Sequence, residues 1–245
     1  MYILIHLKKL STKTSNFMQN NRVLSLDILR GLAVFLMILY HLSFDLNYFN
    51  FLSLDLNNQI FWKLFRYLII FLFLFSFGYS MILSSYISST KKILKRIAIL
   101  FTLASTITIV TYFIFPKSWI YFGILHFILL AYIYAQFLIK LKPITLLAIV
   151  IVLYILYFLG FLHTSFIYET LKELLHLPSK SEDLVRFFPW FNIVLIGMAF
   201  AKYKVLEKIN IKYELKYLKI LGQNALLVYM IHQPILFGII FLLSK

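Results

Sequence analysis

The chain lacks cysteine and has few charged residues. None of its 245 residues is cysteine, which excludes disulfide bonds and metal sites built on thiolates. Only 13% of the residues are charged, whereas a soluble domain carries about 25%. The sequence also has no glycine-rich phosphate loop, no serine nucleophile elbow and no histidine cluster with metal-ligand spacing. We therefore expect neither a soluble domain nor a metal-dependent enzyme.

Hydrophobic residues make up 62% of the chain, and its mean hydropathy is +0.89. Apolar runs long enough for a hydrocarbon core of roughly 30 Å lie near residues 24–44, 60–83, 97–115, 119–141, 144–162, 186–202 and 218–243. These runs predict an all-α, multi-pass membrane protein with about seven transmembrane helices. The connections between them are too short for a separate soluble domain. We therefore expect one transmembrane domain over residues 22–245, preceded by a short basic segment over residues 1–21.

The net charge of +15 follows an alternating pattern along the chain. Basic residues are concentrated at 8–22, 91–96, 140–142 and 202–219, in every second connection between the predicted helices. Cytoplasmic loops of membrane proteins carry such an excess of lysine and arginine. This pattern predicts a cell-membrane protein with its amino terminus in the cytoplasm and its carboxyl terminus outside. The basic residues thus indicate a lipid bilayer as partner, and no nucleic acid is expected.

The segment Leu26–His41, LDILRGLAVFLMILYH, places ionisable side chains in an otherwise apolar run. A charge at the centre of the hydrocarbon core costs about 2.5 to 3.5 kcal/mol on insertion scales, so such residues usually have a function. At about 100° per residue, Arg30 and His41 share one helix face, roughly 16 Å apart along the axis. Asp27 precedes Arg30 by one turn, and Asp45 follows His41 by four residues. The four side chains form one polar stripe.

This stripe allows two interpretations. In the simpler one, Asp27 and Arg30 form a salt bridge at the cytoplasmic end, and His41 is an interfacial residue at the other end. In the functional one, Asp45 orients His41 as a general base, and Arg30 holds a phosphate or carboxylate group. Gly31 would let another backbone or a ligand come close to Arg30. A base at one depth and an anion-binding group at another would suit a reaction that crosses the membrane.

The arginine and histidine of this segment, with ten residues between them, resemble the first-helix motif of the large acyltransferase family that O-acylates bacterial surface sugars. The longer run from Ser25 is more similar to short prokaryotic relatives of heparan-alpha-glucosaminide N-acetyltransferase. Three later blocks also resemble that second group: YFGILHFI at 121–128, FPWFNIVLIGMAFAK at 188–202 and LGQNALLVYMIHQPIL at 221–236. The resemblance covers most of the chain in order.

The resemblance implies an integral membrane acyltransferase. Such an enzyme takes an acyl group, typically acetyl, from coenzyme A in the cytoplasm and delivers it to an amine or hydroxyl of a glycan outside. It implies acetyl-CoA as donor substrate, a sugar or glycan as acceptor, and no metal. We predict catalytic roles for His41, Asp45 and His126, and roles in binding the acyl donor for Asp27, Arg30, Asn224 and His232. Both a general base and a transient acyl carrier are open as roles for His41.

The other candidates each have a structural alternative. His126 could complete the site or pack as a histidine hydrogen-bonded to a neighbouring helix. His232, which precedes Pro234 in an apolar run, could line a channel or form a structural polar contact. Asn224 and Gln223 could bind a ligand, but interhelical hydrogen bonds would account for them equally well.

Two other classes of function fit the same residues. A transporter could use the polar stripe as a proton or anion relay. A non-catalytic membrane partner of a glycan pathway would need no chemistry from it. A homodimer is compatible with any of these functions.

Overall fold

The computed structural model describes residues 23–86, 88–162, 172, 174–179, 181, 183–211 and 215–245. Within these residues the regular structure consists of helices, and no strand occurs. The all-α prediction is therefore confirmed for the described part of the chain. The basic segment predicted over residues 1–21 lies outside the described residues.

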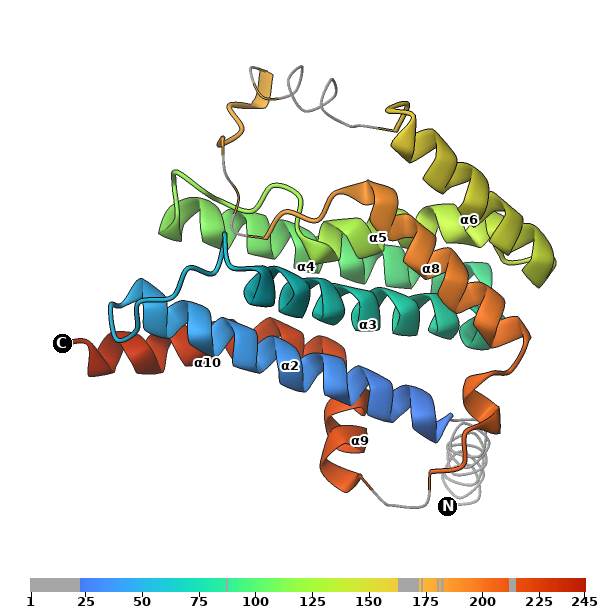
Figure 1. The fold of residues 1–245 in the computed structure, drawn as a ribbon, viewed down its shortest axis with the longest axis horizontal. Coiled ribbons are helices and arrows are strands. Elements are labelled where there is room, and N and C mark those ends of the chain that lie inside the picture. Colours follow the sequence, from blue (N-terminus) through green and yellow to red (C-terminus); the bar gives the residue numbers. More distant parts are fainter. Residues whose placement is uncertain are drawn as a thin grey trace, which may run out of the picture. The chain divides into compact units, whose positions relative to one another are not determined.

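Nine helical elements follow one another in the described residues, eight of them α-helices (Figure 1). They are α2 (Leu24–Tyr48), α3 (Ile60–Ser85), α4 (Thr90–Ile114), α5 (Ile124–Leu138), α6 (Pro143–Phe158), α8 (Phe187–Lys202), the 3₁₀ helix η1 (Leu206–Lys208), α9 (Lys216–Gln223) and α10 (Ala225–Leu243). Four of them, α2, α3, α4 and α10, are long and apolar enough to cross a bilayer, and α5, α6 and α8 are shorter apolar helices. These apolar helices indicate a multi-pass membrane protein.

Local sequence explains where several helices begin and end. A helix satisfies its own backbone hydrogen bonds, which is why apolar segments in lipid adopt it. Pro143 begins α6, where its missing N–H would have had no partner inside the helix. Gly160, with φ 88°, lies just after α6 in a left-handed conformation that glycine adopts without steric cost. Gly123 is the N-cap of α5, so that helix begins later than the predicted span at 119–141.

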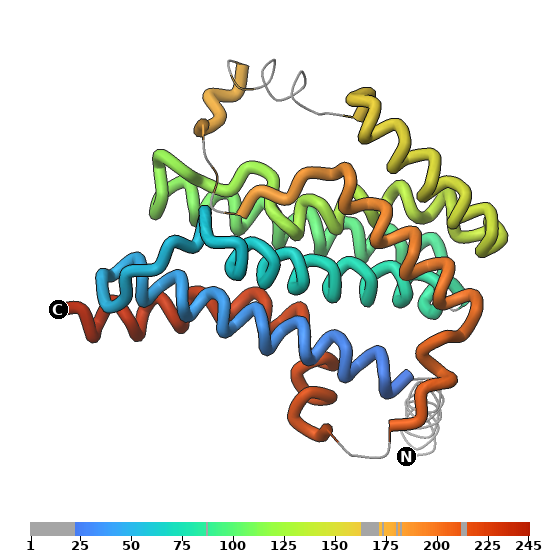
Figure 2. Tube along the Cα trace, in the orientation of Figure 1, coloured from blue at the N-terminus to red at the C-terminus, as the bar shows by residue number. Residues whose placement is uncertain are grey.

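The predicted single span at 218–243 is wrong, because the structure divides it into α9 and α10 at Asn224. Asn224 has φ −110° and ψ 20°, outside the helical range. Its Nδ2 donates to the carbonyl of Ile220 at 2.9 Å, which satisfies one of the free carbonyl groups at the end of α9. The tube in Figure 2 follows the chain through this break from α9 into α10.

The chain divides into two compact units, and the boundary falls inside α3. Unit 1 comprises residues 1–69 and 206–245, and its described part contains α2, the first part of α3, η1, α9 and α10. α9 and α10 both pack against α2 (Figure 1). η1 is also tied to α2, because Ser25 Oγ donates to the carbonyl of Leu206 at 2.5 Å.

Unit 2 comprises residues 70–205 and contains the rest of α3 with α4, α5, α6 and α8. Within it α3 and α8 cross at two glycines, Gly78 and Gly197, each pressed against the backbone of the other helix. Phe127 of α5 packs on Phe187 of α8 with ring centroids 5.3 Å apart. Small residues allow such close backbone contact, which stabilises helix pairs in lipid.

Candidate functional site

The first turns of α2 hold an ion pair that also contacts α9. Arg30 Nη1 donates to Asp27 Oδ1 at 3.1 Å, one helical turn away. The other carboxylate oxygen of Asp27 accepts from Gln223 Nε2 at 3.2 Å. A buried carboxylate is costly unless it is paired and hydrogen-bonded, and Asp27 meets both conditions. The expected salt bridge is therefore confirmed, and Gln223 joins it through an interhelical hydrogen bond.

Two glycines bring the backbones of α2 and α9 into contact next to this ion pair. A Cβ atom at Gly31 would overlap the carbonyl of Leu218, and one at Gly222 would overlap the carbonyl of Asp27. Each helix thus contributes a glycine that contacts the backbone of the other, and moving α2 and α9 apart would remove both contacts. The expectation that Gly31 admits another backbone is confirmed, and that backbone belongs to α9.

A second polar cluster lies further along α2, where α10 packs against it. His41 and His232 face each other with ring centroids 4.9 Å apart and ring planes inclined by 62°. Gln233 Nε2 donates to Asp45 Oδ1 at 2.7 Å. Asp45 is fully buried and His232 is 8% exposed. We call His41, Asp45, His232 and Gln233 the α2–α10 cluster.

Three atoms of the α2–α10 cluster are buried without a hydrogen-bond partner in the described part of the chain: Asp45 Oδ2, Gln233 Oε1 and His232 Nε2. The carbonyl of Tyr229 can only accept, so His232 Nδ1 donates to it at 2.7 Å. In a neutral ring the proton on Nδ1 leaves Nε2 as an acceptor. All three atoms are therefore acceptors, and a buried acceptor of this kind needs a partner such as water or a ligand, or a functional reason.

The structure corrects one detail of the sequence interpretation. The expected hydrogen bond between Asp45 and His41 is not formed in the described part of the chain, because Gln233 takes one carboxylate oxygen and the other has no partner. His232 lies beside His41, and its role in donor binding stays a prediction. Sequence spacing brings Asp45 and His41 to one face, but it does not show which neighbour on another helix competes for the carboxylate.

His126 lies in unit 2, near the start of α5. Its Nδ1 accepts from the backbone N–H of Gly123 at 3.2 Å, and its Nε2 lies 3.0 Å from Thr108 Oγ1. Thr108 donates its hydroxyl proton to the carbonyl of Ile120 at 2.9 Å, so it accepts from His126. Both ring nitrogens are engaged within unit 2, as the structural alternative for this histidine requires. Its predicted catalytic role stays a prediction.

Asn224 marks the break between α9 and α10, beside Gln223, which bonds to Asp27. Its side chain is exposed and bonds to Ile220 within its own segment. Unit 1 therefore brings the predicted donor-binding residues Asp27 and Arg30 close to the α9–α10 break. Whether Asn224 contacts a donor stays a prediction.

Sequence reasoning missed Gln233. It supplies the only hydrogen bond that the side-chain carboxylate of Asp45 makes in the described part of the chain. Its signal in the sequence was weak but present, because Gln233 and His232 form a polar pair inside an apolar run that continues on both sides. Polar residues in such a run usually face other helices rather than lipid.

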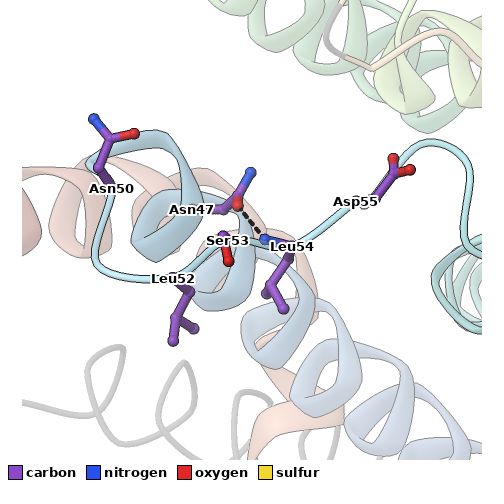
Figure 3. A pocket seen from close by; sticks show the side chains of 6 residues that line it. All are labelled: Asn47, Asn50, Leu52, Ser53, Leu54 and Asp55. Carbon is purple, nitrogen blue, oxygen red and sulfur yellow. Dashed lines mark hydrogen bonds between the residues drawn. The ribbon is translucent and has the colours of Figure 1, made fainter.

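A polar pocket of about 500 Å³ lies in the connection that follows α2 (Figure 3). Asn47 Oδ1 accepts from the backbone N–H of Leu54 at 2.6 Å, which folds the connection back on the end of the helix. The residues lining the pocket are Asn47, Asn50, Leu52, Ser53, Leu54 and Asp55. No pattern in the sequence pointed to it, because these side chains come together only through the turn. The pocket lies at the end of α2 that also carries His41 and Asp45.

The described residues contain no group of three or more histidine, cysteine or acidic side chains that could hold a metal ion. The chemistry that these residues can perform is that of histidine, carboxylate and amide groups, which accept protons and hydrogen bonds.

The apolar helices define a multi-pass membrane protein, and unit 1 buries histidine and carboxylate groups within it. The family model for the heparan-alpha-glucosaminide N-acetyltransferase catalytic domain matches residues 22–234, and the chain belongs to this family. The resemblance read from the sequence is thereby confirmed. The chain is a member of a family of transmembrane acetyltransferases. No curated protein and no solved structure matches it.

Proposed function

We propose that this protein transfers an acetyl group from cytoplasmic acetyl-CoA to an amine or hydroxyl of a sugar on the outer side of the membrane. Family membership supports acetyl transfer. The observation that carries the proposal is the arrangement of α2, which holds Asp27 and Arg30 in its first turns and His41 roughly 16 Å further along. This separation lets one helix serve a donor near one face and an acceptor nearer the other.

In this proposal the two ends of α2 have different tasks. Arg30, held by Asp27, lines the path of the coenzyme A arm, and Asn224 lies at the same end. His41 is the general base at the acceptor end, with Asp45 beside it. A lone pair of the acceptor attacks the thioester carbonyl, the carbon–sulfur bond breaks, coenzyme A leaves as its thiolate, and His41 takes the proton of the acceptor.

In this proposal His126, at the start of α5, keeps its predicted place among the catalytic residues. Its two hydrogen bonds join α4 to the backbone before α5. The proposal needs no metal at any step.

We further propose that residues 22–245 form one catalytic domain with seven spans, the amino terminus in the cytoplasm and the carboxyl terminus outside. The family match runs through both units, which supports one domain. The 15 and 16 residues of α5, α6 and α8 reach only about 22 to 24 Å as helices, less than the roughly 30 Å of an average hydrocarbon core. Local bilayer thinning would accommodate them.

The absence of cysteine allows a clean test of this topology. We expect Asn57→Cys, in the exposed connection after α2, to react with a membrane-impermeant maleimide in intact cells. Lys91→Cys, exposed in the first turn of α4, should react only after the cells are opened, because the basic residues there place it in the cytoplasm. The cysteine-free parent chain is the background control. Labelling of Lys91→Cys in intact cells would contradict the orientation.

We also propose that the polar pocket after α2 receives the sugar acceptor. Its amide, hydroxyl and carboxylate side chains are the groups that bind sugar hydroxyls. In the proposed topology this connection lies outside. The pocket follows Asp45 in the chain by only a few residues, so it lies near the proposed base.

Asn50 offers a selective test of the pocket. Its φ of 62° is a left-handed conformation that glycine adopts at no steric cost, so Asn50→Gly removes the amide and keeps the turn. We expect the KM for the sugar to rise about five-fold, since one neutral hydrogen bond contributes about 1 kcal/mol. The KM for acetyl-CoA should not change. Steady-state kinetics with each substrate varied would measure both values, and an unchanged KM for the sugar would exclude Asn50 from the acceptor site.

The test of the function itself uses purified protein in liposomes. Labelled acetyl-CoA is supplied outside, and glucosamine or methyl α-glucosaminide is trapped inside. We expect labelled N-acetyl product in the lumen and free coenzyme A outside. Leakage of glucosamine through the protein without acetyl-CoA, together with no acetylated product, would contradict acetyl transfer and support the transporter alternative.

A further inference from the structure

We propose that Asp45 receives the proton that His41 removes from the acceptor, and that His232 and Gln233 of α10 position these two groups for it. This inference rests on the proposed acetyl transfer with His41 as the base. It concerns the step after His41 has taken the proton of the acceptor. His41 must lose this proton before the next turnover, and a base acting alone provides no route for it.

The hydrogen bonds of Asp45 leave one oxygen ready for this role. Gln233 Nε2 binds Oδ1 at 2.7 Å, and this bond fixes the orientation of the carboxylate. Oδ2 is buried and has no hydrogen-bond partner in the described part of the chain. Asp45 follows His41 by four residues, and side chains at this spacing on a helix are neighbours, with Cβ atoms about 5 to 6 Å apart. The free oxygen is therefore within one helical turn of the base.

Two side chains of α10 in the α2–α10 cluster each leave an acceptor atom unused in the described part of the chain. Gln233 uses its amide nitrogen on Asp45, which leaves its Oε1 as an acceptor. His232 uses Nδ1 on the carbonyl of Tyr229, which leaves Nε2 as an acceptor beside the His41 ring. An N–H that forms on His41 when it takes a proton thus lies in a cluster that contains groups able to accept it. Such a set favours passage of a proton over binding of an anion.

Water on the two sides of the membrane takes up and supplies the protons of each catalytic cycle. The new bond joins the acceptor nitrogen or oxygen to the acetyl carbon, and the carbon–sulfur bond breaks. The proton of the acceptor moves to His41, then to Asp45 Oδ2, and leaves to water at the acceptor side. The coenzyme A thiolate takes one proton from water on the donor side, so one proton is released and one is consumed in each turnover.

The decisive variant is Asp45→Asn, because asparagine keeps an oxygen that can accept from Gln233 but cannot take up the proton. We expect kcat to fall about 100-fold, at the lower end of general acid–base effects, with KM unchanged for both substrates. The solvent deuterium isotope effect on kcat should increase, since proton transfer becomes slower than the other steps. Asp45→Glu, which restores a carboxylate, should recover most of the lost rate.

Gln233→Leu provides a second, independent test should Asp45→Asn fail to accumulate. It removes the hydrogen bond that orients Asp45 but retains the carboxylate. We expect a fall of about ten-fold in kcat together with an increased isotope effect. Ile235→Ala, at an exposed position of the same helix, is the matched control and should leave both quantities unchanged.

The outcomes separate this inference from the proposed function. A folded Asp45→Asn protein with wild-type kcat and isotope effect, in a background where His41→Ala abolishes transfer, would overturn the role of Asp45 alone. A slower Gln233→Leu protein with an unchanged isotope effect would reduce Gln233 to a structural contact and overturn its positioning role. Absence of transfer by the wild-type chain would instead contradict the proposed function.

Discussion

Replacing His41 by alanine should lower the rate of acetyl transfer by about 10² to 10⁴-fold, the range typical for loss of a general base. His41 lies against His232, and the carboxylate of Asp45 follows it by one turn on α2. In the proposal His41 is the residue of this cluster that takes the proton from the acceptor. Binding of acetyl-CoA should persist, because Arg30 and Asp27 lie roughly 16 Å away along the helix. Transfer of label to glucosamine in liposomes measures the first effect, and calorimetric titration with coenzyme A measures the second.

Leu39→Ala is the matched control for this prediction. Leu39 is on the same helix, is 38% exposed and lies outside the α2–α10 cluster, so the variant should transfer acetyl at the wild-type rate. His41→Ala with wild-type transfer would remove His41 from the mechanism. Loss of coenzyme A binding in the same variant would indicate that the two ends of α2 do not act separately.

Gly222→Ala should destabilise the protein severely, although alanine is the better helix former by about 1 kcal/mol. The added Cβ would overlap the carbonyl of Asp27 and approach the backbone nitrogen of Gly31. These are backbone atoms of a neighbouring helix, so no side-chain rotation can relieve the overlap. The shift it forces also separates Gln223 from Asp27, whose carboxylate would then lose one of its two donors. Thermal unfolding in detergent, followed by the loss of monodisperse protein, measures the effect.

We expect Gly238→Ala, on the adjoining helix, not to destabilise the protein. Gly238 lies in α10, and a Cβ there meets no atom within 4 Å. The substitution should leave the melting temperature unchanged or raise it, because only helix propensity changes. Equal melting temperatures for Gly222→Ala and Gly238→Ala would show that the α2–α9 contact is looser than the structure indicates.

The polar stripe of α2 shows which contacts can be predicted from spacing along one helix. The one-turn spacing of Asp27 and Arg30 predicted their salt bridge, which forms at 3.1 Å. The same reasoning placed Asp45 beside His41 but assigned its hydrogen bond wrongly, because Gln233 comes from a helix 188 residues further along the chain. Partners at such separations depend on how helices pack, and helical periodicity carries no information about that.

The break at Asn224 has a related cause. The segment from Leu218 to Leu243 is mostly apolar, so composition alone indicated one span, although Gln223 and Asn224 interrupt it. In the structure Gly222 packs against the carbonyl of Asp27, and Asn224 caps α9 through Ile220. The break thus coincides with a tertiary contact that average hydropathy does not report.

The helical class, the presence of several apolar helices and the stripe of ionisable residues on α2 could all be predicted from composition, periodicity and local spacing, which act over one or two helical turns. The family was indicated by the resemblance of several sequence blocks and confirmed by the family match. Only the tertiary structure decided that His41 faces His232, that Gln233 holds Asp45, and that a polar pocket forms after α2. These contacts depend on the close approach of α9 and α10 to α2, where backbone atoms meet at glycines and polar side chains find partners far away in the sequence.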